Sequence, residues 1–358
     1  MATKKKMLQA AAGNAGGAGL DITDVFSTYL YEGNETARTI TNGIDLDGEG
    51  GLVWIKARTA AQLHWLFDTE RGALKSLTSA DTLAELERAN SVTSFNTDGF
   101  TLGSYSGTND NNEDMASWTF RKAPKFFDVV TYTGTGAART VDHNLGGTVG
   151  SIIIKRTDTT SNWAVYHRAN TVAPETDYLS LNLTNATADD ATYWNDTAPT
   201  STQFTVGTNA VVNASGGTYV AYLFAHNDGD GEFGPDGDQD IIKCGSFTTD
   251  GSGFGQDVNL GWEPQWLLVK RTDSASGGDW KLIDTMRGYP AYQAGNSATQ
   301  RLEAEDSGAE ATQIYGGILS GTGFKIQDNA NADYIYIAIR RGPLAPPESG
   351  TEVFAIDT

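Results

Sequence analysis

Apolar and polar residues alternate along most of this chain, in short runs separated by turn-forming residues. The runs are rich in Val, Ile, Tyr, Trp and Thr, and clusters of Gly, Asn, Asp and Ser interrupt them. A period of two residues is typical of antiparallel strands joined by turns. In "YIYIAIRR" (334–341) isoleucines occupy one face and Tyr and Ala the other, so both faces are apolar, as in a central strand. The pattern predicts an all-β chain.

One segment departs from this alternation. In "TSADTLAELERAN" (78–90), Thr78 or Ser79 could cap a helix, and Leu83 and Leu86 would share one of its faces. We expect a short helix here, inserted between strands of the β scaffold.

The same pattern occurs three times. Each copy begins with an apolar run that ends in lysine: "LVWIK" (52–56), "SIIIK" (151–155) and "WLLVK" (266–270). A tryptophan follows each lysine after a polar turn, at Trp65, Trp163 and Trp280. Each copy closes with an alternating strand: "MASWTFRKAP" (115–124), "TYVAYLFAHND" (218–228) and "DYIYIAIRRGP" (333–343). The repeat predicts a strand, a variable turn and a second strand, with Trp in the core and Lys at a strand end, where its charge reaches solvent. The alternative is a carbohydrate site, with Trp stacking on sugar faces and Lys bonding to hydroxyls.

Each repeat is as long as a small domain. We therefore expect three tandem antiparallel β-sandwich modules, jelly-roll-like in type, arranged in a row. Their expected bounds are 25–126, 127–238 and 239–343, with an extended N-terminal arm over 1–24 and a C-terminal linker and strand over 344–358.

Charge and composition limit the partners. The 45 acidic and 25 basic residues give a formal charge of −20, which argues against nucleic acid and anionic membrane surfaces as partners. No apolar run approaches the roughly 18 to 20 residues that a membrane-spanning helix needs. The single cysteine, Cys244, cannot form an intrachain disulfide.

Catalytic motifs are missing from the sequence. The four histidines, at 64, 143, 167 and 226, lie in separate segments without an HExxH pattern or a paired Cys. The chain also lacks a Walker loop, a GxGxxG motif opening a helix, and GxSxG. We expect a protein that is not an enzyme. A glycan-cleaving activity needs only two carboxylates and has no local sequence motif, so it is kept as an alternative.

The most distinctive local feature is the acidic segment "NDGDGEFGPDGDQD" (227–240). Calcium prefers six to eight oxygen ligands from a flexible loop, which predicts a site formed by acidic residues at alternate positions: Asp228, Asp230, Glu232, Asp236 and Asp238. The segment departs from the EF-hand pattern. The alternative is a solvated acidic linker whose like charges keep two modules apart. We expect no other cofactor.

The first residues differ from the rest of the chain. Lys4, Lys5 and Lys6 precede a stretch of Ala and Gly that has no hydrophobic face. A basic arm on an acidic protein can dock on an acidic groove, which predicts an attachment arm.

Several long motifs resemble one known family. They are the repeated "WEPQWLLVKRTD…DW…DTMRG" block, "ASWTFRKAPKFFDVVTYTGTG", "YVAYLFAHNDGDG…IIKCGSFTTDGSG" and the opening "MATKKKMLQAAAG". The chain resembles structural proteins of tailed bacteriophages, especially marine and cyanobacterial phages, over nearly its whole length. That family has no assigned catalytic residues.

The resemblance implies a tail fibre or tail-associated receptor-binding protein, made in the host cytoplasm and assembled into the virion with other virion proteins. Such a protein would attach through its N-terminus and contact host surface glycans. A homotrimer is expected, because trimerisation would cover apolar sheet faces and edges that a row of sandwiches leaves exposed. Capsid decoration or neck proteins, and a polysaccharide depolymerase, are the alternatives.

Overall fold

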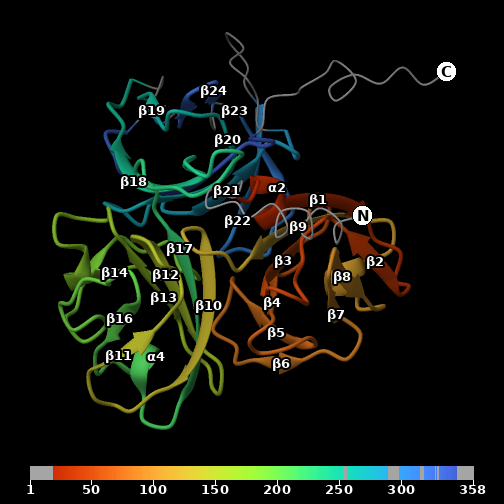
Figure 1. Cartoon of the computed structure of the whole chain (residues 1–358), viewed down its shortest axis with the longest axis horizontal. Coiled ribbons are helices and arrows are strands. Elements are labelled where there is room, and N and C mark those ends of the chain that lie inside the picture. Colours follow the sequence, from red (N-terminus) through yellow and green to blue (C-terminus); the bar gives the residue numbers. More distant parts are fainter. Residues whose placement is uncertain are drawn as a thin grey trace.

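The computed structural model describes residues 19–252, 256–288, 298–314, 318–326, 328 and 330–344. Three β modules, one for each sequence repeat, form three lobes around a common centre (Figure 1). The described helices are short: α2 (Ile22–Val25), α3 (Ser106–Asn109), α4 (Ala210–Asn213) and the 3₁₀ turn η1 (Pro174–Thr176). The prediction of an all-β, sandwich-type fold is confirmed.

The first module contains nine strands. They are β1 (Phe26–Glu32), β2 (Arg38–Thr41), β3 (Gly51–Ala57), β4 (Trp65–Asp68), β5 (Lys75–Thr78), β6 (Leu86–Glu87), β7 (Val92–Asn96), β8 (Gly99–Leu102) and β9 (Asp114–Arg121). The main sheet has the order β1-β9-β3-β4-β5-β6, and the small sheet has the order β2-β8-β7. The first and last strands of the module are therefore neighbours.

The second module repeats this plan. Its strands are β10 (Phe127–Thr133), β11 (Arg139–Asp142), β12 (Val149–Arg156), β13 (Trp163–His167), β14 (Asp177–Tyr178), β15 (Ala188–Asp189), β16 (Gln203–Val206) and β17 (Thr218–Ala225). The main sheet has the order β10-β17-β12-β13, while β11 pairs with β16 and β14 with β15.

The third module has the same core. Its strands are β18 (Ile242–Thr248), β19 (Val258–Asn259), β20 (Pro264–Arg271), β21 (Trp280–Asp284), β22 (Ala298–Glu303), β23 (Ala311–Ile314), β24 (Ile318–Ser320), β25 (Gly323–Lys325) and β26 (Asp333–Arg340). The main sheet has the order β18-β26-β20-β21-β22-β23, and the small sheet has the order β19-β25-β24.

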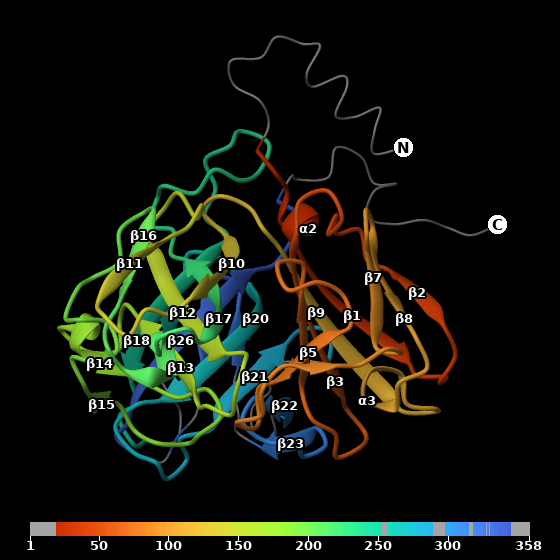
Figure 2. The ribbon, with the colours of Figure 1, turned by 90° about the horizontal axis from the view of Figure 1, so that it is seen from below.

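The two apolar faces of each main sheet have different neighbours. In the first module, Val53 and Ile55 of β3 pack into a local core with Phe100 of the small sheet. Leu52 and Trp54 alternate with them and enter a second core that contains residues of all three modules. Because strand residues alternate between faces, one strand serves both cores. The central sheets meet at the middle of the molecule, as Figure 2 shows from below.

The predicted row of modules is therefore wrong. Phe120 lies where the three modules meet, with ring centroids 5.0 Å from Phe26, 5.5 Å from Phe127 and Phe224, and 5.5 Å from Trp266. A row would leave one apolar face of each main sheet in water. Packing three such faces together removes them from water, and each large side chain buried in this way contributes about 1.5 to 3 kcal/mol.

The predicted helix over 78–90 is also wrong. The segment contains turns and the short strand β6, and Leu83 is exposed. Its polar groups bond to neighbouring modules instead of to a helical turn: the Ser79 hydroxyl donates to the Ala304 carbonyl at 2.5 Å, and the Glu85 N–H donates to the Thr157 carbonyl at 2.9 Å. Tertiary contacts thus override the local helical preference.

The two ends of the described chain lie together. Asp21 caps α2 through the Thr23 N–H, and its other carboxylate oxygen accepts the Leu344 N–H at 2.9 Å. Leu20 pairs in parallel with Phe233 of the acidic segment. Among the described residues, no helix is long and apolar enough to cross a membrane.

Candidate functional site

The three repeat lysines, Lys56, Lys155 and Lys270, are buried at the boundaries between modules, so the prediction that their charges reach solvent is wrong. The Lys155 ammonium donates to the Ser161 carbonyl of its own module at 2.7 Å and to the Thr82 carbonyl of the first module at 3.2 Å. Lys270 likewise donates to its own Gly278 and, at 2.9 Å, to Thr184 of the second module. Burial lowers the pKa of each repeat lysine, including Lys56, to about 8. Similar placement at three boundaries indicates a structural role.

The repeat tryptophans join the modules too, with one exception. Trp163 lies opposite Lys155 and donates its indole N–H to the Thr78 carbonyl of the first module at 2.9 Å. Trp280 lies opposite Lys270 and donates to Ser180 of the second module at 2.9 Å. Both were predicted to be core residues, and both are buried in the central core.

Trp65 does not have the predicted equivalent position. It pairs with Ile55, one residue before the repeat lysine, so the residue opposite Lys56 is His64. Trp65 therefore faces the local core of the first module. His64 is fully buried and accepts the Trp54 indole N–H at Nδ1, at 2.9 Å, and burial lowers its pKa well below the usual value. In the first module a bulky Trp54 lies beside a smaller His64. In the other two copies the position of Trp54 holds Ile153 or Leu268, and the position of His64 holds a tryptophan.

A buried Asp–Arg pair occurs in two of the copies. The Asp284 carboxylate accepts the Arg287 backbone N–H at 2.9 Å, its Nε at 2.6 Å, and the Trp118 indole N–H from the first module at 2.9 Å. Asp68 has the same two contacts with Arg71, and Tyr222 of the second module donates to it at 2.8 Å. The repeated letters "DTERG" and "DTMRG" carry this signal, although sequence reasoning assigned them no role.

The equivalent contact between the second and third modules uses different chemistry. His167 occupies the position of the aspartates, and Ile337 occupies that of Trp118 and Tyr222. Isoleucine offers no donor, so a buried carboxylate facing it would lack a partner. His167 instead bonds through Nε2 to the Tyr336 carbonyl at 3.0 Å. Each boundary therefore matches its donor to its acceptor, which indicates that the recurring polar residues hold the modules together.

Three carboxylates of the acidic segment over 227–240 have partners within the chain. Asp240 accepts the Gly229 and Gly231 N–H groups, Asp230 accepts the Asp228 N–H, and Glu232 pairs with Lys125 at 2.9 Å. Three carboxylates of this segment do not gather within 4.8 Å of one another. Calcium at Asp228, Asp230, Glu232, Asp236 and Asp238 stays a prediction.

A group of acidic residues occurs elsewhere, in the third module. Carboxylate oxygens of Asp279, Glu303 and Glu305 lie within 4.8 Å of one another. Burial raises the pKa of Glu305 to about 7, and both of its oxygens accept the Trp280 N–H. Arg301 pairs with Glu303 at 2.8 Å, so part of the negative charge of this group already has a cationic partner.

The remaining predicted site residues do not come together. Lys4, Lys5 and Lys6 lie outside the described residues. The histidines take part in no metal-binding group among residues 19–252, where all four lie. Burial lowers the pKa of His167 and His226 to about 4, so both are neutral at pH 7.

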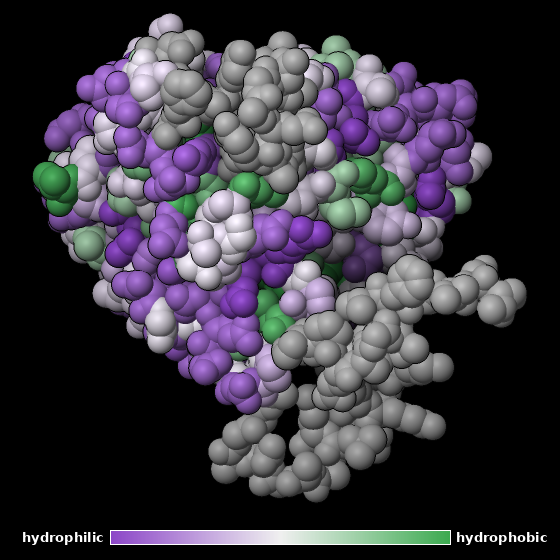
Figure 3. Space-filling view, turned by 90° about the horizontal axis from the view of Figure 1, so that it is seen from above, coloured by the Kyte–Doolittle hydropathy of each residue, from purple (hydrophilic) through white to green (hydrophobic). Residues whose placement is uncertain are grey.

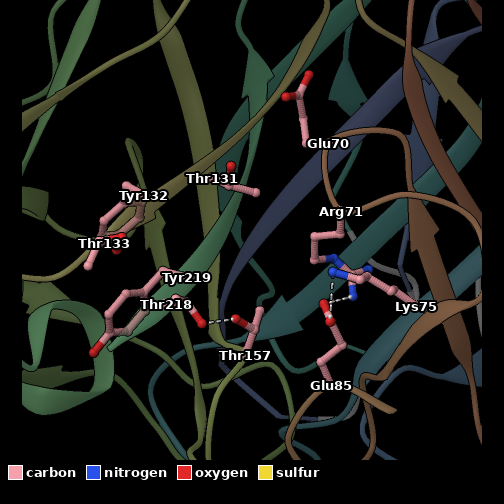
Figure 4. A pocket seen from close by; sticks show the side chains of 10 residues that line it. All are labelled: Glu70, Arg71, Lys75, Glu85, Thr131, Tyr132, Thr133, Thr157, Thr218 and Tyr219. Carbon is pink, nitrogen blue, oxygen red and sulfur yellow. Dashed lines mark hydrogen bonds and ion pairs between the residues drawn. The ribbon is translucent and has the colours of Figure 1, made fainter. Parts of the chain in front are cut away.

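A groove of about 520 Å³ lies on the boundary between the first and second modules (Figure 4). We name it the threonine groove. The first module contributes Glu70, Arg71, Lys75 and Glu85 from the segments around β5, and the second contributes Thr131, Tyr132, Thr133, Thr157, Thr218 and Tyr219 from β10, β17 and the end of β12. The volume falls in the range of small-molecule sites, roughly 300 to 1,000 Å³.

The two walls of the threonine groove differ in chemistry. On one wall, Arg71 pairs with Glu85 at 3.2 Å, and Lys75 pairs with the same carboxylate at 3.5 Å. On the other wall, the Thr157 and Thr218 hydroxyls are hydrogen-bonded at 2.6 Å (Figure 4). Sequence reasoning missed this site, because its residues come from distant segments that show no shared motif.

One protein-family model matches the chain, over residues 21–343. Its description is a domain of unknown function, DUF7483. The chain belongs to this family. The match spans all three modules, and DUF7483 assigns no activity to them. No curated protein matches the chain.

Proposed function

We propose that this chain is a structural component of a phage particle, namely a tail fibre or tail-associated receptor-binding protein that contacts host surface glycans. One observation supports this best: the repeated ionisable residues hold the modules together. The Lys155 ammonium and the Asp68–Arg71 and Asp284–Arg287 pairs all lie at module boundaries. A scaffold built in this way offers a rigid surface, and its repeated ionisable side chains are buried where they serve packing between modules.

The described ends support attachment from one side. Asp21 and Leu344 are hydrogen-bonded, so the segments before and after the described core start from the same place. The basic residues Lys4, Lys5 and Lys6 would then dock on another virion protein as an attachment arm. The apolar sheet faces are buried within the chain, so they no longer argue for a homotrimer, which stays a prediction without that support.

The proposal is tested by locating the protein on the particle. Antibodies against the purified chain should label intact virions at the tail in electron micrographs, and they should block adsorption to host cells. Labelling of the capsid or neck would favour the alternative of a decoration or neck protein. Virions that lack the protein altogether would refute the structural role.

A polysaccharide depolymerase is the second candidate, and the carboxylates of Asp279, Glu303 and Glu305 favour it. Glycoside hydrolysis uses two carboxyl groups, one of which has a raised pKa, and Glu305 meets that requirement. The two groups usually lie about 5 to 10 Å apart, whereas the oxygens of this group lie closer, within 4.8 Å of one another. Glu305, with its pKa of about 7, would be the acid. Release of reducing ends from host polysaccharide, abolished by Glu305→Gln and retained by Glu232→Gln on the exposed loop, would establish this activity.

A further inference from the structure

The three module boundaries are internal copies of one another, so each can be compared with its equivalents. At the boundary between the first and second modules, the Glu85 N–H donates to the Thr157 carbonyl at 2.9 Å. At the boundary between the third and first modules, the Glu310 N–H donates to the Arg58 carbonyl at 2.6 Å. Thr157 and Arg58 also follow equivalent register pairs in β12 and β3. Arg58 is therefore the counterpart of Thr157.

The side chains of Arg58 and Thr157 differ in how much of the space between the two modules they occupy. Arg58 pairs with Glu310 at 2.8 Å, and Glu310 pairs with Arg287 at 2.9 Å, which leaves the Glu310 side chain 8% exposed. The short Thr157 side chain does not reach across in this way, and the Glu85 side chain remains 21% exposed. The threonine groove is thus the space that an arginine occupies at the boundary between the third and first modules. At the boundary between the second and third modules the counterpart is Thr272, whose carbonyl accepts the Thr187 N–H at 2.9 Å.

The second module also differs from the others in a row of side chains across its sheet. Thr133 pairs with Thr218, and Thr157 donates its N–H to the Thr218 carbonyl, so three threonines lie side by side. The middle position is an acid in the other modules. The equivalent rows are Glu32, Asp114 and Arg58 in the first module, and Thr248, Asp333 and Thr272 in the third. This groove therefore presents an uncharged hydroxyl at the middle position, where both equivalents present a carboxylate.

Charge selects the kind of ligand. Arg71 is already paired with Asp68 and Glu85, and Lys75 shares Glu85, so neither cation is left without a carboxylate partner. The whole chain carries a formal charge of −20, which repels anionic glycans. Hydroxyl, carboxylate and ammonium groups that face an open groove are suited to hydrogen-bonding a neutral, hydroxyl-rich molecule.

We propose that the threonine groove binds a neutral oligosaccharide, with Thr133, Thr157 and Thr218 on one side and Lys75 and Glu85 on the other. This rests on the proposed contact with host glycans and deepens it by giving that contact a place and a ligand class. Figure 3 shows another face of the molecule, where hydrophilic residues surround small hydrophobic groups.

The test uses the full chain and two arginine variants. Thr157→Arg places the arginine of the boundary between the third and first modules into the groove, where Glu85 can pair with it as Glu310 pairs with Arg58. Thr248→Arg is the matched control, because Thr248 is exposed in the equivalent row of the third module. Equal melting temperatures would show that both variants fold.

Binding is measured by calorimetry with host-surface polysaccharide hydrolysed to oligosaccharides and separated into neutral and acidic fractions. We expect the neutral fraction to bind the unmodified chain, Thr157→Arg to weaken binding by at least about tenfold, and Thr248→Arg to change it less than about twofold. Equal binding by both variants, or preference for the acidic fraction, would overturn the groove assignment and leave the glycan contact standing.

Two other outcomes separate this inference from the proposed function. If no fraction binds, the groove proposal fails, and labelling of the virion still decides the structural role. If the neutral fraction binds in the groove and the virion lacks the protein, the groove proposal stands and the proposed function fails.

Discussion

Removing the Asp284 carboxylate tests whether the modules depend on one another for stability. In Asp284→Ala, three buried N–H donors lose an acceptor: the Arg287 backbone and Nε groups, at 2.9 and 2.6 Å, and the Trp118 indole, at 2.9 Å. The Arg287 side chain is fully buried and would retain Glu310 and the Leu282 carbonyl.

The expected loss follows from these contacts. Leaving one partner of a buried ion pair behind costs about 3 to 5 kcal/mol, and an unsatisfied buried donor costs about 1 to 3 kcal/mol. Because Arg287 keeps other partners, we expect a loss of about 3 to 5 kcal/mol in the free energy of unfolding. Asp189→Ala, on an exposed strand of the second module, should change it by less than about 0.5 kcal/mol.

Urea unfolding followed by tryptophan fluorescence measures both effects. A shared core predicts one cooperative transition that moves as a whole to lower urea in Asp284→Ala. A double-mutant cycle between Trp118→Phe and Asp284→Asn should give a coupling of about 1 to 3 kcal/mol. A loss below about 1 kcal/mol, or separate unfolding of the third module alone, would refute the reasoning.

Further predictions concern packing, pH and thiol reactivity. His64→Trp should overpack the core beside Trp54 and lower the free energy of unfolding by about 1 to 3 kcal/mol in the same urea assay. Adding Trp54→Leu should recover part of this loss, because Leu and Trp occupy the two equivalent positions in the third module. His167 has a pKa of about 4 in the folded chain, below its unfolded value of 6.5. The stability that it contributes is therefore present above pH 6.5 and is lost as the pH falls to 4. Over that pH range the melting temperature of His167→Gln should fall less steeply than that of the unmodified chain. Lys155 has a pKa of about 8, below the usual 10.5, so its contribution to stability should rise between pH 8 and 9.5. Lys155→Met should remove this rise. The same dependence of melting temperature on pH in the variant and the unmodified chain would contradict a buried ammonium. Burial raises the pKa of the Cys244 thiol, so a thiol reagent at pH 8 should modify it only after unfolding, and rapid reaction of the folded chain would contradict this.

Local patterns in the sequence accounted for the strands and their repetition. Alternation of apolar residues predicted an all-β chain, and the three lysine-ended runs correspond to β3, β12 and β20. These inferences succeed because strand formation depends on side chains two residues apart, which the sequence displays directly. The repeat spacing failed at one place, because Trp65 follows His64 and only the pairing of β3 with β4 shows which of them faces Lys56.

The sequence by itself determined that each main sheet has two apolar faces. Only the tertiary structure decided what covers them: one face packs on a small sheet of the same module, and the other packs on the two remaining modules. A hydrophobic face attracts any other hydrophobic face, so its partner cannot be identified from its own residues. Polar pairing between distant residues then makes the arrangement specific, since Asp284 needs the Trp118 donor and His167 the Tyr336 carbonyl. The threonine groove arises in the same way, where a loop of one module lies beside three strands of another.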